Sequence, residues 1–306
     1  RGPGAPRFPN MWKFKRLWAS LCGLAAPFAA ALALASPAVA KPPIWIVRDG
    51  DSEVVLFGSI HVLPPGLKWR PAALDKALTR ADDLWFELPI DPASEVETAQ
   101  IAAAKGYLPQ GQSLAALLAP ATQARLAKAC QALDVDPRLI DRLEPWFAEV
   151  VLASAQFRDQ GAYADAGVEK TLAASAPASA QRRAFETPAQ QIEMFDAAPR
   201  AAQIASLEES LVELDSDPHA YEHLLAAWMR GDVRALDREA LAPLRKAAPD
   251  IYERLVTARN AAWTRTLDAR LKGRGRTVVV VGVGHLIGPG GVPARLRALG
   301  YSVQGP

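Results

Sequence analysis

The chain has 306 residues, half of them hydrophobic (50%), which is enough for one large domain or two small ones. Residues 1–40 hold five of the 35 basic residues and none of the 33 acidic ones, so the remainder carries a net charge of −3. The remainder therefore lacks the basic excess of nucleic-acid-binding proteins, and we expect no nucleic-acid partner.

The first forty residues have the composition of an export signal. Met11 opens a basic stretch, and an apolar run rich in alanine and leucine follows over Leu17–Ala35. Ala38-Val39-Ala40 then matches the A-x-A pattern of a cleavage site. We therefore predict that residues 1–40 are upstream residues and a cleaved signal peptide, with a periplasmic or secreted mature protein. An uncleaved membrane anchor is the alternative, which the prolines near and within the apolar run disfavour.

Cysteine usage adds one constraint on the mature protein. Cys22 lies in the signal segment, so only Cys130 remains after cleavage. The mature chain is therefore predicted to be exported and yet to contain no intrachain disulfide. Contact with a membrane is expected only through the signal segment before cleavage.

A β-hairpin is predicted at the start of the mature sequence. Ile44–Arg48 and Glu53–Phe57 are apolar runs, and Asp49-Gly50 lies between them. Asp-Gly between two such runs is a strong signal for a tight hairpin turn.

The second hairpin strand leads directly into a G-x-x-H motif, Gly58-Ser59-Ile60-His61. A Pro/Gly turn, a helix over Pro71–Arg80 and a strand over Asp83–Leu88 are predicted to follow. Because a strand–helix–strand crossover leaves its strands parallel, His61 and the end of the later strand should lie at one edge of the sheet. Glu87 stands there between two apolar residues, a position where an acid is rarely buried without a partner.

A long helical region rich in alanine is predicted from about Gln112 to Lys272. A loop at Ala174–Ala180 and a short strand over Arg183–Glu186 interrupt it. Thr187, with proline next and glutamine three residues on, is typical of a helix start, so Glu186 is placed at a strand-to-helix junction. The expected helices cover Leu114–Ala119 (capped by Ser113), Pro120–Leu133, Leu139–Phe157, Pro199–Leu214, Pro218–Met229, Arg234–Ala247 and Pro249–Leu271.

The same order of strand, G-x-x-H motif, turn, helix and strand is predicted again near the end of the chain. Thr277–Val281 is entirely β-branched, which predicts a strand buried on both faces, and it stops at Gly282-Val283-Gly284-His285. A helix over Pro293–Leu299 and a strand over Tyr301–Gln304 complete the repeat. The two motifs predict two half-sites that meet across one sheet. The predicted fold is α/β, a central mixed β-sheet flanked by helices with a large helical insertion, in a single domain over residues 41–306.

Two imidazoles and one carboxylate at the same sheet edge are a typical ligand set for a catalytic divalent metal with an open position. His61, His285 and Glu87 form that set, and such a metal lowers the pKa of bound water and polarises a carbonyl. The alternative is that each glycine-flanked histidine only caps its strand. Glu186 is a second candidate acid or a hydrogen-bond anchor for its turn. Arg259 lies in a helix, where a solvated or structural role is the default.

Two other patterns match known motifs less well. His219-Ala220-Tyr221-Glu222-His223 has the H-x-x-E-H spacing of some zinc peptidases, but Asp217-Pro218 places it in the first turn of a helix, where polar residues are common. Gly282-Val283-Gly284 after a valine strand suggests a dinucleotide fingerprint. The third glycine of that fingerprint is missing, and too little chain follows for the rest of the unit.

The paired motifs, with Phe86-Glu87 between them, resemble the TraB/GumN family, which includes the TIKI proteins. The resemblance covers about residues 44–304, and at Glu169 the family more often has aspartate. It implies a fold related to erythromycin esterase and ChaN and, through TIKI, metal-dependent peptidase activity. Further matching segments are Gly167-Val168-Glu169, Glu186-Thr187 with Gln190, Trp228 with Gly231-Asp232, and Arg259-Asn260.

We therefore predict an exported hydrolase, most similar to a peptidase, that depends on a divalent ion (Mn, Co or Zn) and acts on a peptide or a small molecule. His61, His285 and Glu87 are the expected metal ligands, with Glu87 either a ligand or the general base. Glu186 and Arg259 are expected to orient the site or the substrate. The alternative is a non-enzymatic periplasmic protein that binds haem or a peptide between the same histidines.

Overall fold

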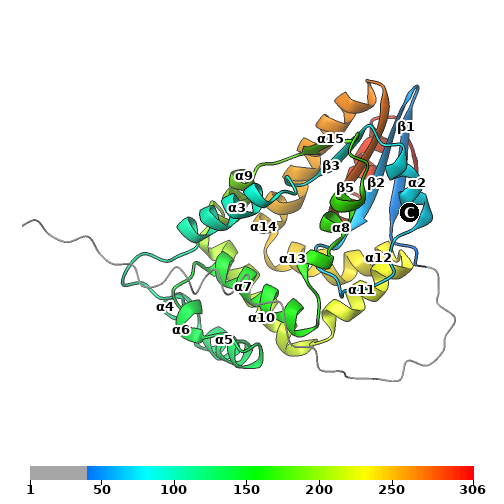
Figure 1. The fold of residues 1–306 in the computed structure, drawn as a ribbon. Coiled ribbons are helices and arrows are strands. Elements are labelled where there is room, and N and C mark those ends of the chain that lie inside the picture. The colour runs from blue at the N-terminus through cyan, green and yellow to red at the C-terminus, as the bar shows by residue number, and fades with distance from the viewer. Residues whose placement is uncertain (1–39) are drawn as a thin grey trace, which may run out of the picture. The chain divides into compact units, whose positions relative to one another are not determined.

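A six-stranded mixed β-sheet forms the centre of the protein, with the strand order β4-β3-β5-β2-β1-β6 (Figure 1). The computed structural model describes residues 40–306, so the predicted signal peptide lies almost wholly outside the described residues. Within the described residues, β1 is the one strand whose direction is opposite to that of the other five. The strands are β1 (Ile44–Asp49), β2 (Ser52–Ser59), β3 (Asp83–Phe86), β4 (Gln181–Ala184), β5 (Gly275–Gly282) and β6 (Ser302–Gln304).

The predicted hairpin is confirmed. β1 pairs with β2 in a register that brings Asp49 opposite Ser52, and Gly50 in the turn has a φ of 48°, which a side chain would disfavour. β5 lies between β3 and β2, and its four valines, Val278–Val281, are all buried. A strand covered on both faces explains why this run has no polar alternation.

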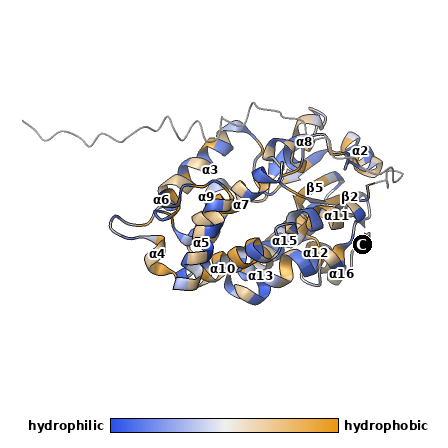
Figure 2. Ribbon diagram, turned by 90° about the horizontal axis from the view of Figure 1, so that it is seen from below, coloured by the Kyte–Doolittle hydropathy of each residue, from blue (hydrophilic) through white to orange (hydrophobic). Residues whose placement is uncertain are grey.

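The two predicted strand–helix–strand units are also confirmed. Helix α2 (Ala72–Thr79) connects β2 to β3, and α16 (Val292–Ala298) connects β5 to β6. The two connections run in opposite directions across the sheet, so right-handed crossovers place their helices on opposite faces. Figure 2 shows α2 on one side of β2 and β5 and α16 on the other.

The segment between β3 and β5 is mainly helical and carries a hydrophobic cluster separate from the one around the sheet. Residues 40–306 nevertheless form one compact unit. The helices here are α3 (Pro92–Lys105), α4 (Leu114–Leu117), α5 (Pro120–Ala132), α6 (Pro137–Ile140), α7 (Pro145–Asp159), η1 (Ala164–Ala166), α8 (Val168–Ser175), α9 (Pro188–Asp196), α10 (Arg200–Ser216), α11 (Ala220–Arg230), α12 (Val233–Leu236), η2 (Asp237–Leu241), α13 (Ala242–Ala247), α14 (Pro249–Tyr252), η3 (Glu253–Thr257) and α15 (Ala258–Leu271).

The structure corrects some helix boundaries. The helix expected over Leu139–Phe157 is interrupted, because Pro145 cannot continue the preceding turn and instead begins α7. The segments η2 and η3 are π-helical turns inside longer helices, a feature that periodicity does not predict. Within residues 40–306, no helix combines the length and apolar character needed to cross a membrane.

Candidate active site

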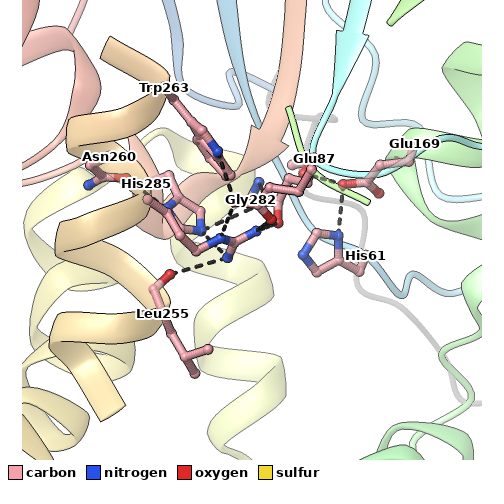
Figure 3. Close-up of polar contacts among 11 residues, drawn as sticks. His61, Glu87, Glu169, Leu255, Asn260, Trp263, Gly282 and His285 are labelled. Carbon is pink, nitrogen blue, oxygen red and sulfur yellow. Dashed lines mark hydrogen bonds and ion pairs between the residues drawn. The ribbon is translucent and has the colours of Figure 1, made fainter. Parts of the chain in front are cut away.

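Four parallel strands end at the same edge of the sheet, and each is followed by one predicted site residue. His61 follows β2, Glu87 follows β3, Glu186 follows β4, and His285 ends the short 3-10 helix η4 (Val283–His285) after β5. The backbone N–H of Gly282 donates to Oε1 of Glu87 at 2.7 Å, which joins two of these strand ends directly. The structure therefore brings together the side chains that the paired motifs predicted (Figure 3).

His61 is oriented by a carboxylate that the sequence did not identify as a site residue. Its Nδ1 lies 2.8 Å from Oε1 of Glu169, in the first turn of α8, and the Ser59 hydroxyl donates to the same oxygen at 2.5 Å. Because a carboxylate only accepts, Nδ1 of His61 carries the proton. The Glu169 carboxylate raises the pKa of His61 to about 9. The side chain of His61 is still 62% exposed, so its Nε2 is accessible.

His285 is oriented in the same way from the other half of the fold. Asn260 on α15 donates through Nδ2 to the carbonyl of Gly290, so its Oδ1 faces Nδ1 of His285 at 2.7 Å. The amide oxygen can only accept, so the proton of His285 again lies on Nδ1 and the lone pair on Nε2. His285 is only 7% exposed, and burial lowers its pKa to about 4. Both histidines therefore direct Nε2 into the site.

Gly282 marks the point where the donor atoms converge. A Cβ at this position would lie 3.2 Å from Oε1 of Glu87 and 3.3 Å from Nε2 of His61. Nε2 of His285 lies 3.9 Å from the same Glu87 oxygen. Only glycine leaves this space open.

Arg259 is the most extensively bonded side chain of the site. Its Nε and Nη2 bind both oxygens of Glu186 at 2.8 Å, and Nη2 also donates to Glu87 at 2.6 Å. Its Nη1 contacts the carbonyl of Leu255 at 3.2 Å and Nε2 of His285 at 3.0 Å. These contacts use all five N–H groups of the guanidinium, so Arg259 has none left for a substrate.

The electrostatics keep Glu87 ionised. Burial, the largest influence, raises its pKa, but His285, Arg259, His61 and the Gly282 amide together lower it to about 2. With His285 neutral and His61 protonated, the three carboxylates Glu87, Glu169 and Glu186 and the Arg259 guanidinium leave one net negative charge, and release of the His61 proton on metal binding would make it two. That charge matches a divalent cation.

The residues fit a divalent metal in ligand type, orientation and charge. A metal-binding histidine normally donates its other ring N–H to a carboxylate or amide oxygen, as His61 and His285 both do. Glu87 would supply the oxygen ligand. One contact competes: Arg259 donates to the His285 nitrogen that a metal would need. In keeping with this, no three His, Cys, Asp or Glu side chains within residues 40–306 are placed to hold an ion as they stand.

Sequence reasoning named Glu186 and Arg259 as residues that orient the site or the substrate, but it did not identify their contacts. Arg259 is not solvated but buried, and Glu186 holds Arg259 and the Trp263 indole instead of its own turn, which Thr187 and Gln190 cap. Asn260 was assigned the default structural role. Only the family resemblance gave a signal for Glu169 and Asn260, because their partners are distant in sequence.

The histidines of the H-x-x-E-H pattern lie outside this site. His219 immediately precedes α11 and His223 is in its first turn, and both side chains are mostly exposed. The ring of His223 pairs with Asp217. Their position at a helix start agrees with the expectation from Asp217-Pro218.

Comparison with known proteins supports a relationship over the whole sheet and the site. The chain is 25% identical over 288 residues to the uncharacterized protein YbaP of Escherichia coli strain K12, covering 94% of this chain and 99% of that protein. YbaP of Shigella flexneri matches to the same extent. No solved structure matches the chain. The sequence profile of the TraB/PrgY/gumN family matches residues 43–305, which include both G-x-x-H motifs, and the chain therefore belongs to this family.

Proposed function

We propose that this protein is an exported hydrolase that uses a divalent metal ion, Mn, Co or Zn, to cleave a peptide or a related small molecule. His61 and His285 would bind the ion through Nε2, and Glu87 through its carboxylate. The observation that supports this most directly is the pair of imidazoles whose Nδ1 atoms are fixed by Glu169 and Asn260. When bound, the metal would supply a water of lowered pKa and polarise the scissile carbonyl.

The protein's own groups would have distinct tasks in such a reaction. Glu169, supported by Ser59, would hold the ring of His61 in position. Arg259 and Glu186 would orient the site and not the substrate, because every N–H of Arg259 is already bonded within the protein. Exclusion of water from the inner half of the site would come from Trp263, whose ring lies 4.5 Å from that of His285.

Export to the periplasm or cell exterior is part of the proposal and is supported by the composition of residues 1–40. A closer relation of the fold to erythromycin esterase and ChaN is likewise proposed from the resemblance of the paired motifs. The competing class is a non-enzymatic protein that binds haem or a peptide. The burial of His285 argues against haem between the two histidines.

The decisive experiment measures metal content and turnover together. The purified exported protein is analysed for bound metals and tested on a peptide library, beside His61→Ala, His285→Ala and the double variant. Either single change should abolish metal binding and turnover, and the double variant should be no worse, because residues that act as a unit are non-additive. The matched control is His219→Ala with His223→Ala, which should retain both properties and change stability by only about ±0.5 kcal/mol per site.

Independent losses of stability that add, in a parent protein without metal, would refute the proposal. A loss of metal from the His219→Ala and His223→Ala control, with its fold intact, would move the site to α11.

A further inference from the structure

The guanidinium of Arg259 lies where the proposed site needs an accessible nitrogen. Nη1 of Arg259 donates to Nε2 of His285 at 3.0 Å. Arginine remains protonated and can only donate, and the Nδ1–H of His285 is bonded to Asn260. The lone pair on Nε2 of His285 therefore accepts the hydrogen bond from Arg259.

We propose that Arg259 is a built-in cation that competes with the divalent metal for His285 and thereby sets the metal affinity of the site. The inference rests on the proposed function, since it concerns the same ligands. In the metal-free protein Arg259 would keep His285 neutral and correctly oriented. Binding of a metal would require Nη1 to give up this one contact.

The surrounding contacts allow that exchange without release of the whole side chain. Glu186 binds Nε and Nη2 of Arg259, on the side of the guanidinium away from Nη1, and the Trp263 ring lies 4.6 Å from the guanidinium carbon. The other Nη1 contact is to Leu255, within the π-helical turn η3, where the helix already departs from regular bonding. A small tilt of the planar guanidinium about its paired Nε–Nη2 edge would thus free His285 while Glu186 keeps the charge of Arg259 paired.

Electrostatic repulsion adds to the cost of metal binding. A divalent ion at Nε2 of His285 would lie close to the guanidinium, in a buried site where charges are weakly screened. The Glu87 carboxylate would have to bind the metal and Arg259 at the same time, because its Oε2 already accepts from Arg259 at 2.6 Å. We therefore expect Arg259 to lower metal affinity while it supports the geometry of Glu87.

A charge-matched variant tests the competition. Arg259→Met combined with Glu186→Gln removes one positive and one negative charge, so the net charge of the site is unchanged. Titration of Co²⁺ into the metal-free protein, followed by its absorption spectrum and by calorimetry, should show at least about tenfold tighter binding, equivalent to one lost hydrogen bond of about 1.4 kcal/mol. Glu186→Gln alone keeps Arg259 and adds net positive charge, and it should bind Co²⁺ no more tightly than the unmodified protein.

A second measurement avoids dependence on variants. In ¹⁵N NMR of the unmodified protein, Co²⁺ or its diamagnetic substitute Zn²⁺ should perturb Nε2 of His285 and accelerate exchange of the Arg259 N–H protons with water. Metal binding that leaves the Arg259 protons protected, or equal affinity in the double variant, would overturn the competition but leave the proposed metal site. Failure of both proteins to bind any Co²⁺ or Zn²⁺ would instead overturn the metal site itself, and the competition with it.

Discussion

A methyl group at Gly282 is a direct probe of the space between the proposed ligands. The backbone of Gly282, with φ −49° and ψ 133°, suits any residue, so Gly282→Ala should not strain the chain. The new Cβ would lie 3.2 Å from Glu87 Oε1 and 3.3 Å from His61 Nε2. Contacts below 3.4 Å are tight, so both side chains would have to withdraw by a few tenths of an ångström.

The effect on stability should be small and the effect on function large. Loss of backbone freedom in the unfolded chain stabilises an alanine variant by about 0.4–1 kcal/mol, and the displaced side chains offset a similar amount. The free energy of unfolding should therefore stay within about 1 kcal/mol of the parent value. Metal affinity and turnover should fall about 10- to 100-fold, the range seen when ligands lose their support.

Calorimetric metal titration, peptide turnover and urea unfolding would measure these quantities on one preparation. Gly290→Ala is the matched control, because no atom lies within 4 Å of a Cβ at that position and the backbone carbonyl that accepts from Asn260 is retained. It should change neither metal affinity nor turnover. Full metal affinity and turnover in Gly282→Ala would refute the reasoning, since the ligands would then not converge at this point.

Further predictions concern charge, pH and processing. Glu169→Gln should return the pKa of His61 from about 9 toward its ordinary 6.5, as followed by NMR of the ring in the metal-free protein. The raised pKa of His61 contributes stability that is lost as pH rises from 6.5 through about 9. Because the pKa of His285 is lowered, the free energy of unfolding should fall by about 3 kcal/mol as pH falls from 6.5 through about 4. The lowered pKa of Glu87 should cause a further loss of stability as pH falls from 4.5 through about 2. Urea unfolding across this pH range measures both effects, and a stability that does not change with pH would contradict the burial of these groups. Glu87→Gln should lose metal outright if the carboxylate is a ligand, and should keep weakened metal without turnover if it is a base. Intact-mass analysis of exported protein should show an N-terminus at Lys41, whereas a full-length chain held in the membrane would disprove cleavage.

The strands and their motifs could be predicted because their signals are local. Five β-branched residues in a row at Thr277–Val281 indicate a buried strand, and Asp49-Gly50 indicates a hairpin, whatever the rest of the chain does. By contrast, α3 (Pro92–Lys105) has no fully buried residue, so it shows no apolar stripe that would predict it. The break before Pro145 was missed because the apolar face on either side of it looks continuous in sequence.

The site was predictable only as far as the motifs reach. His61, Glu87 and His285 follow strands whose direction the crossovers fix, so their meeting could be inferred from topology. The positions of Glu169 and Arg259 depend on contacts over 108 and 172 residues of sequence, to His61 and Glu87 respectively. An arginine within a polar helix looks the same in sequence whether it is solvated or buried.

The contacts of Glu87 favour one of its two proposed roles. Its Oε1 accepts the Gly282 N–H and its Oε2 accepts from Arg259, so both oxygens are bonded in the ionised form. A carboxylate held in this way, with its pKa lowered to about 2, is a weak acceptor for a proton at neutral pH. A metal ligand needs the opposite quality, a permanent negative charge with a fixed orientation. Glu87 therefore suits metal binding better than proton abstraction.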